Sequence, residues 1–336
     1  MKLFGHDNAI ADFEAGLGEG RLHHAWLLAG PEGVGKARFG VLAARRLLAE
    51  RSGLPKPDGF FVPDDHEAAR LIAAESHPDF RRLERLPRDK KELETARADR
   101  DLDAERARNI TIGQIRSLHA LLDTTPSISN WRAVLIDAVD DLERSAANAL
   151  LKSLEEPPAR TVFLLVSHNP GRLLPTIRSR CRTLRFQPLD DDVMASAIRQ
   201  VRPDIGEFEL EALMAAGKGA PGRALRYAGI GISELDGAIA ALITEGDADN
   251  CRRSELAQSL GLKKALPRYE AFLERAPAAV EHHARQLRGP DLSHAIVVWE
   301  EARALAGSAS RSALDPKATV FALAGMLASL HEPAHG

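Results

Sequence analysis

Several features that mark particular protein classes are scarce or missing in this 336-residue sequence. It has only two cysteines, Cys181 and Cys251, which excludes a disulfide framework and a four-cysteine zinc site. Its longest apolar runs, such as Val162 to Val166, are far too short to span a bilayer. Residues 1–7 lack the apolar stretch of a signal peptide. The formal net charge is -3, so no basic excess indicates nucleic-acid binding by the whole chain. We therefore expect a cytoplasmic protein that does not contact a membrane.

What the sequence does contain is an alternation of apolar strands and helices before residue 187. The run 25–29 predicts a buried strand, and the glycine-rich turn 30–36 after it leads into an amphipathic helix. Two further buried strands are predicted at 132–137 and 162–166, with a helix at 146–156 between them. Strands that alternate with helices indicate an α/β fold with a parallel sheet covered on both faces.

The rest of the sequence has helical patterns alone. A short helix is predicted to open at the aspartates 190–192, and from about residue 232 the pattern is helical almost to the end. Gly261, Gly289 and Gly307 are expected to break these helices. The predicted domains are an α/β domain at 1–187, a small helical lid domain at 188–231 and a helical collar domain at 232–336.

The segment from 51 to 109 shows little periodicity and contains five prolines. Its charged stretch 81–108 has both signs of charge, which is typical of a solvated loop with a charged helix; a DNA-contacting role is the alternative. The segment has no cysteine, and His66 and His77 alone do not make a structural zinc site. We expect His77 to lead into a short strand, and we expect no bound metal.

One motif in the sequence has the spacing of a phosphate-binding loop. Gly30, Gly33, Gly35 and Lys36 lie in a G-x-x-x-x-G-K pattern between the predicted strand and helix. In such loops backbone N–H groups bind phosphate and the lysine neutralises it. Ala37 stands where a hydroxyl would bind Mg²⁺, and it has no oxygen. The glycines could also serve only the backbone of a tight turn.

A second departure affects the metal side of the same predicted site. Asp137 ends a buried strand, as a metal-binding aspartate of such a site would, but Ala138 follows where a glutamate commonly activates water. Asp140 and Asp141 lie further along and are expected at a helix start, where they suit the helix dipole. With Ala37, two groups needed for hydrolysis are missing together. The sequence predicts a degenerate site without ATPase activity, while residual ATP binding stays open.

Three segments resemble the bacterial clamp-loader subunits of the AAA+ ATPase superfamily. They are the entry Arg21–Leu28, the segment Ala147–Pro158 (ANALLKSLEEPP) and the Ser-Arg-Cys motif in Ile177–Cys181. The motifs occur in order at suitable spacing, and the resemblance covers roughly residues 1–231. It implies an AAA+ fold with a RecA-like parallel sheet, followed by a helical lid and a helical collar through which subunits associate.

Within that family the tau/gamma subunits hydrolyse ATP and the delta-prime subunits do not, and Ala37 and Ala138 place this chain on the delta-prime side. Gly222 stands at the second-sensor position, where the family has an arginine, and Arg223 is expected to face elsewhere. Ser167 occupies the first-sensor position, where a structural role is open. The family often carries a four-cysteine zinc module that this chain lacks.

The Ser179-Arg180-Cys181 motif carries the strongest functional expectation. The resemblance implies that Arg180 acts as an arginine finger, entering the ATP site of an adjacent subunit and stabilising the transferring phosphoryl group. The alternative is an arginine that pairs with a surface acid. Arg178 and Arg182 flank it and are expected to serve positioning or solvation, and Cys181 is expected to be a small buried apolar residue.

These features together predict a delta-prime-type clamp-loader subunit of a DNA polymerase III holoenzyme. The expected partners are the tau/gamma and delta subunits, and through the complex the sliding clamp and primer-template DNA. Two alternatives stay open at this point: an active clamp-loader ATPase of tau/gamma type, and an AAA+ adaptor outside replication. ATP turnover by the isolated chain separates the first alternative, and co-purification with clamp-loader subunits separates the second.

Overall fold

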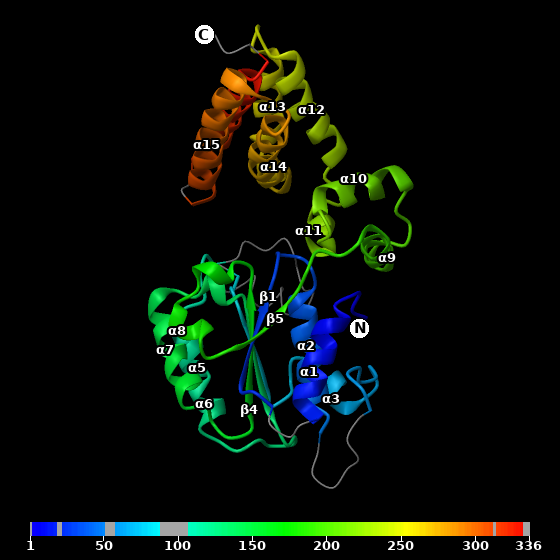
Figure 1. Ribbon diagram of the computed structural model, residues 1–336, viewed down its shortest axis with the longest axis vertical. Helices are drawn as coiled ribbons and strands as arrows, with labels where there is room; N and C mark the ends of the chain where they lie inside the picture. Colours follow the sequence, from blue (N-terminus) through cyan, green and yellow to red (C-terminus); the bar gives the residue numbers. More distant parts are fainter. Residues whose placement is uncertain (1, 19–21, 51–57, 88–106, 312–313, 332–336) are drawn as a thin grey trace. The chain divides into compact units, whose positions relative to one another are not determined.

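A computed structural model describes most of the chain, namely residues 2–18, 22–50, 58–87, 107–311 and 314–331. The contacts divide the chain into two compact units (Figure 1). The first unit comprises residues 1–197 and 219–222, and the second comprises residues 198–218 and 223–336. The three-domain division with boundaries at 187 and 231 stays a prediction.

The first unit is built on five parallel strands, which are β1 at Ala25–Ala29, β2 at Phe80–Glu84, β3 at Arg132–Asp137, β4 at Thr161–Ser167 and β5 at Arg182–Arg185. Their order in the sheet is β2-β3-β4-β1-β5. β1 therefore lies beside β4 in the interior, with Trp26 opposite Leu164, while β5 is an edge strand. The all-parallel sheet confirms the predicted α/β fold class.

Helices connect these strands and cover both faces of the sheet (Figure 1). In the first unit they are α1 at Asp7–Gly18, α2 at Lys36–Leu48, α3 at Glu67–Ala73, α5 at Ile112–Ser117, α6 at His119–Leu122, α7 at Arg144–Glu155 and α8 at Pro175–Arg178, with 3-10 turns at Val139–Asp141 and Pro170–Arg172. The short strand expected after His77 is β2. Of the charged stretch 81–108, residues 88–106 lie outside the described residues.

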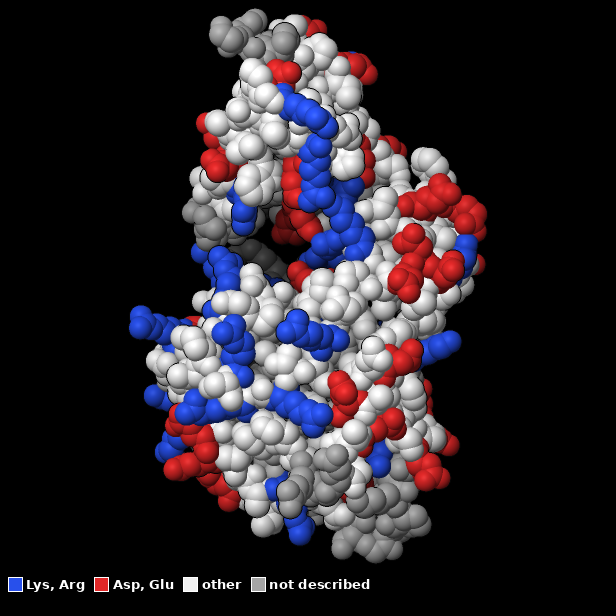
Figure 2. Space-filling view, in the orientation of Figure 1, with Lys and Arg blue, Asp and Glu red and all other residues white. Residues whose placement is uncertain are grey.

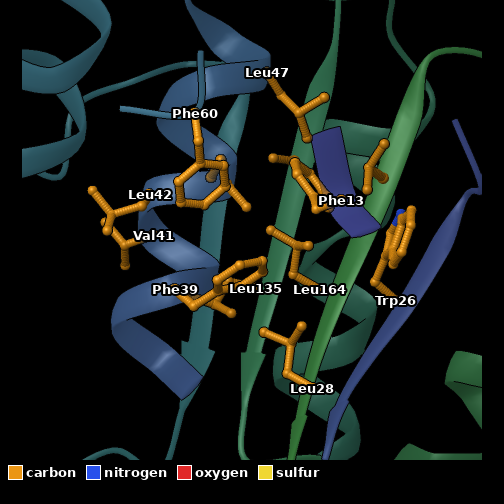
Figure 3. Close-up of a cluster of buried hydrophobic side chains, with 14 of the residues drawn as sticks. Phe13, Trp26, Leu28, Phe39, Val41, Leu42, Leu47, Phe60, Leu135 and Leu164 are labelled. Atoms are coloured by element: carbon orange, nitrogen blue, oxygen red, sulfur yellow. The ribbon is translucent and has the colours of Figure 1, made fainter. Parts of the chain in front are cut away.

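Two apolar clusters, one on each face of the sheet, form the core of this unit. Phe13 of α1 and Phe39 of α2 pack with Trp26 and Leu28 of β1 on one face (Figure 3). Leu27, between those two strand residues, points to the opposite cluster, where α5, α7 and α8 supply the apolar side chains. Each large side chain buried in this way contributes about 1.5–3 kcal/mol relative to exposure. The alternation along β1 therefore fixes helices on both sides.

A buried carboxylate holds the loop that precedes β3. Asp79 is 1% exposed and accepts hydrogen bonds from the backbone N–H groups of Ser127, Ile128 and Ser129 at 2.6, 2.9 and 3.0 Å. Backbone donors that are buried without a partner are costly, so one side chain here satisfies three of them. This contact ties the start of β2 to the start of β3.

The second unit is helical. Its helices are α9 at Asp191–Val201, α10 at Glu207–Gly217, α11 at Pro221–Arg226, α12 at Ile232–Glu245, α13 at Cys251–Leu260, α14 at Leu266–Ala284, α15 at Gly289–Arg311 and α16 at Pro316–Ala328, with a 3-10 turn at Lys263–Ala265. Both α9 and α11 begin in the first unit and end in the second. None of the helices among the described residues is long and apolar enough to cross a membrane.

The expected helix breaks are confirmed at two of three glycines. α13 ends before Gly261, and α15 begins at Gly289. The expectation for Gly307 is wrong, because α15 continues through it. A glycine inside a helix costs only about 1 kcal/mol relative to alanine. Buried side chains of the same helix, such as Ala295 and Ala302, offset that cost by packing into the helical unit.

Candidate functional site

The glycine-rich turn has the backbone form of a phosphate-binding loop. Gly33 and Gly35 have φ angles of 80° and 114°, which side chains other than glycine rarely adopt. Gly30 is required for a different reason, since a Cβ there would lie 2.2 Å from the carbonyl oxygen of Phe186. The three predicted glycines thus allow β1 to pass into α2 through a tight turn beside the end of β5.

The lysine of this loop binds the loop itself. Lys36 is 2% exposed, and its Nζ donates hydrogen bonds to the carbonyl oxygens of Gly30 and Pro31 at 2.6 and 2.5 Å. Burial lowers the pKa of Lys36 to about 8, although nearby carboxylates act in the opposite direction. Nε2 of His6 donates to the carbonyl of Val34 at 2.8 Å and covers the turn from the N-terminal segment. The cation that would neutralise a phosphate is therefore held by carbonyl groups of its own loop.

The second-sensor position also contacts the loop. The backbone N–H of Gly222 donates to the carbonyl oxygen of Gly33 at 2.8 Å. A Cβ at residue 222 would lie 2.9 Å from that oxygen and 3.0 Å from the Cα of Gly33, so an arginine does not fit there without a shift of backbone. Arg223 instead donates to the carbonyl of Gly217 at 2.9 Å. The expectation that Arg223 faces away from the loop stays a prediction.

On the metal side, the aspartate is paired with a cation of the same chain. Asp137 accepts a hydrogen bond from Nη2 of Arg82 at 2.9 Å, and the same guanidinium contacts Glu84 at 3.0 Å. Arg82 lies on β2, whose last residue, Glu84, is in register with Asp137 of β3. Ala37 offers no oxygen. Since the carboxylate expected to bind Mg²⁺ is paired with a guanidinium and the hydroxyl ligand is missing, the residues present do not fit a magnesium nucleotide.

Asp140 has a different role from the one its position suggested. Its carboxylate accepts from Oγ of Ser167 at 3.1 Å and from the two backbone N–H groups that follow Ser167 at 2.7 and 3.1 Å. The expectation that it serves a helix dipole is wrong, because it lies in a 3-10 turn and fastens the end of β4 instead. Asp141, in the same turn, pairs with Arg85 at 3.2 Å, and burial raises the pKa of Asp141.

The Ser-Arg-Cys motif lies directly after α8. Oγ of Ser179 donates to the carbonyl of Thr176 at 3.2 Å, and Sγ of Cys181 lies 3.1 Å from the carbonyl oxygen of Ile177. Burial raises the pKa of Cys181 to about 12, which disfavours the reactive thiolate. These two side-chain contacts stabilise the turn that contains Arg180. Among the described residues, no group of three or more His, Cys, Asp or Glu side chains is placed to hold a metal.

Arg180 itself makes two contacts on neighbouring elements. Nη1 donates to the carbonyl of Thr176 at 2.9 Å, and Nη2 lies 2.8 Å from Oε1 of Glu155, the last residue of α7. The Arg180 side chain is 35% exposed. Arg180 therefore does pair with a surface acid, as the alternative interpretation expected. A guanidinium has five N–H donors, so these two contacts leave donors for a further ligand.

Arg180 and the phosphate-binding loop lie at opposite ends of the sheet. In the parallel pair of β1 and β5, Arg182 is in register with Trp26. Arg180 precedes β5, while Gly30 follows the other end of β1. Gly30 is four residue steps beyond Trp26, which corresponds to about 13 Å along the strands. The chain's own finger candidate is therefore not part of the chain's own loop site.

Other arginines flank Arg180 in the sequence. Arg178 and Arg182, two residues away on either side, are both exposed. Figure 2 shows that Lys and Arg side chains gather over the part of the first unit where α7 and α8 lie. The guanidinium of Arg182 also lies 5.0 Å from the centre of the Trp26 ring. Such a surface favours an anionic ligand over a cationic one.

Comparison with known proteins gives several similarities. Residues 5–190 match the family described as DNA polymerase III, delta subunit. The chain is 35% identical to the DNA polymerase III subunit delta' of Pseudomonas aeruginosa over 212 residues, which is 63% of this chain and 57% of that protein. It is 29% identical to the subunit tau of Escherichia coli over 273 residues, 81% of this chain and 38% of that protein. The chain thus spans little more than half of the delta' relative. A DNA polymerase III gamma subunit-related protein of Thermotoga maritima has a similar structure, with a TM-score of 0.45 and 16% identity over 95% of this chain and 99% of that one.

Proposed function

Because the chain belongs to the DNA polymerase III delta-subunit family, we propose that it is a delta-prime-type clamp-loader subunit. It does not hydrolyse ATP, and it helps to load a sliding clamp onto primer-template DNA in a complex with tau/gamma and delta subunits. Its Arg180 acts as an arginine finger on the nucleotide of an adjacent tau/gamma subunit. The similarity to relatives named delta' and tau supports this choice of partners.

Three features of the loop site support the lack of intrinsic ATPase activity. Lys36 is bound to loop carbonyls, Asp137 is paired with Arg82, and Ala37 offers no ligand to a metal. Each of these groups would have to be released or replaced before a magnesium nucleotide could bind. We expect phosphate release by the purified chain to stay at background, with or without primed DNA. A turnover that Lys36→Ala abolishes would overturn this part of the proposal.

The observation that carries the proposal is the position of Arg180. It lies at the end of the sheet opposite the chain's own loop, and its guanidinium is partly exposed. A fixed guanidinium can stabilise the charge that spreads over the transferring phosphoryl group, at little reorganisation cost. An arginine finger of this kind is worth about 10³–10⁵ in rate. Because the chain's own loop is out of reach, the nucleotide belongs to a neighbour.

The helical residues 232–336 are proposed to form a collar that packs against equivalent regions of the partner subunits. Ile296 and Val297 of α15 support this, because both are large apolar side chains and are 45% and 51% exposed. Adjacent apolar residues exposed on a long helix favour a protein contact over solvent. Other apolar side chains of this region, such as Leu323 and Phe272, are fully buried in the unit's own core.

Reconstitution with tau/gamma and delta subunits tests the proposal. The informative complexes contain only one competent ATP site, the one adjacent to this chain, so that other fingers do not contribute. Arg180→Ala should lower the ATPase rate of that site strongly and reduce clamp loading, while assembly stays intact. Arg180→Lys keeps the charge without the planar fork and should recover only part of the rate. If the Ala variant assembles and turns over like the wild type, the trans-acting role is wrong.

A further inference from the structure

A single carboxylate links the end of α7 to the candidate finger. Oε1 of Glu155 lies 2.8 Å from Nη2 of Arg180, while the carbonyl of Thr176 takes a hydrogen bond from Nη1 at 2.9 Å. The two acceptors come from different elements, because Glu155 ends α7 and Thr176 lies within α8. The guanidinium is planar, so contacts at both of its terminal nitrogens fix the orientation of the plane.

The position of Glu155 is itself fixed by the core and by the end of its helix. The preceding residue, Leu154, is 1% exposed and packs in the cluster beneath the sheet. The carbonyl of Leu154 accepts a hydrogen bond from Nε2 of His24 at 3.1 Å, which ties the last turn of α7 to the segment before β1. The helix stops there, since Glu156 leaves the helical conformation and Pro157 follows. The carboxylate therefore projects from a rigid anchor.

Resting on the proposed function, we propose that Glu155 is the positioning residue for Arg180. It orients the guanidinium so that the remaining N–H groups face the nucleotide of the neighbouring subunit. Glu155 does not touch that nucleotide. A free arginine side chain has considerable rotamer entropy, and a contact already made before docking reduces the entropy that must be lost on docking. The ion pair thus orients the Arg180 guanidinium before the neighbouring subunit docks.

The opposite role, a latch that keeps the finger away from the nucleotide, is disfavoured by energy. The side chains of Arg180 and Glu155 are 35% and 49% exposed, and exposed ion pairs contribute little to stability. That is enough to bias a side-chain rotamer. It is too little to withhold an arginine from a phosphoryl group, because charge-assisted bonds to phosphate are among the stronger hydrogen bonds. The contact to Thr176 involves a neutral carbonyl and does not compete for charge.

The test uses the reconstituted complex in which only the adjacent ATP site is competent. Glu155→Ala should lower kcat of that site by up to about fivefold, the rate equivalent of about 1 kcal/mol. KM for ATP should change little, because the nucleotide is bound by the neighbouring subunit. Glu155→Gln keeps an amide oxygen that can accept the hydrogen bond, so it should recover most of the rate. Glu156→Ala removes the same charge one residue further along and is the matched control, with the wild-type rate expected.

Each outcome decides between distinct ideas. If Arg180→Ala lowers the rate and Glu155→Ala does not, the positioning role fails and the proposed function stands. A faster Glu155→Ala variant would mean a latch and would also overturn the inference. A Glu155→Gln variant as slow as Glu155→Ala would also overturn the positioning role. The double variant Arg180→Ala/Glu155→Ala should be no slower than Arg180→Ala alone, so additive losses in rate would contradict the positioning role as well. If Arg180→Ala itself has no effect, the proposed function fails first. Unchanged thermal unfolding and assembly of the variants exclude a folding defect.

Discussion

Replacing Lys36 with methionine should remove a pH dependence of stability that the phosphate-binding loop gives the wild-type chain. Burial lowers the pKa of Lys36 to about 8, from 10.5 for a free lysine. Between these values the unfolded chain binds a proton that the folded chain has released. The free energy of unfolding therefore rises with pH through this window. From the two pKa values, the rise is about 2 kcal/mol between about pH 7 and about pH 9.5.

The quantity to compare is the difference in unfolding free energy between the wild type and Lys36→Met. Methionine is unbranched and does not titrate, so this difference should shift in favour of the wild type by about 2 kcal/mol across the same window. Cys181 and Tyr227 have raised pKa values, chiefly through burial, and both lower the stability of the folded chain at high pH. They are present in both proteins, so their effect cancels in the difference.

Urea unfolding followed by tryptophan fluorescence makes the measurement. The chain has three tryptophans, and a Trp299→Phe background leaves Trp26 and Trp131, both in the first unit. Lys152→Met removes an exposed lysine of the same unit and controls for the change in net charge. A difference between wild type and Lys36→Met that stays constant with pH would refute the burial of Lys36 against its own loop.

Four further predictions address other contacts. Gly222→Arg should destabilise the first unit by about 1–3 kcal/mol, measured by the same unfolding assay, because its Cβ would press on the backbone of Gly33; a neutral effect would contradict the close packing. Asp79→Ala should cost about 1–3 kcal/mol in that assay, since three N–H groups, one of them on the buried Ser129, lose their acceptor; an unchanged free energy of unfolding would mean that water replaces the carboxylate. A chain truncated after residue 231 should fail to join tau/gamma and delta on size-exclusion chromatography, and normal incorporation would argue against a collar. A chelator should leave the thermal midpoint unchanged, and stoichiometric zinc in elemental analysis would contradict this.

Local patterns in the sequence were sufficient for the central part of the fold. The strand 25–29, the glycine turn and the helix after it follow from period and from the conformational demands of Gly33 and Gly35. The buried strands 132–137 and 162–166 follow in the same way from their apolar runs. The predicted helix break at Gly307 was wrong because a single glycine costs a helix less free energy than the packing of a long helix provides.

The state of the site could not be predicted in the same way, because it depends on contacts between distant residues. The pairing of Arg82 with Asp137 requires that β2 lies beside β3 in one particular register. Arg82 stood only in a stretch of mixed charge, which gave no sign of that register. The bond from Asp140 to Ser167 spans 27 residues and depends on how two strand ends meet. The missing oxygen of Ala37, by contrast, is visible in the sequence itself.

The placement of Arg180 and the phosphate-binding loop at opposite ends of β1 and β5 has a consequence for the symmetry of an assembly. Subunits that meet through two different ends make heterologous, head-to-tail contacts, and identical copies repeat these contacts into a ring or a filament. In this chain one end offers Arg180, while at the other end Lys36 is bound to its own loop and Arg82 is paired with Asp137. Under the proposed function, a series of contacts bridged by nucleotide stops at this subunit. Under the proposed function, one such chain gives the assembly a terminus, which a closed head-to-tail ring of identical subunits does not have.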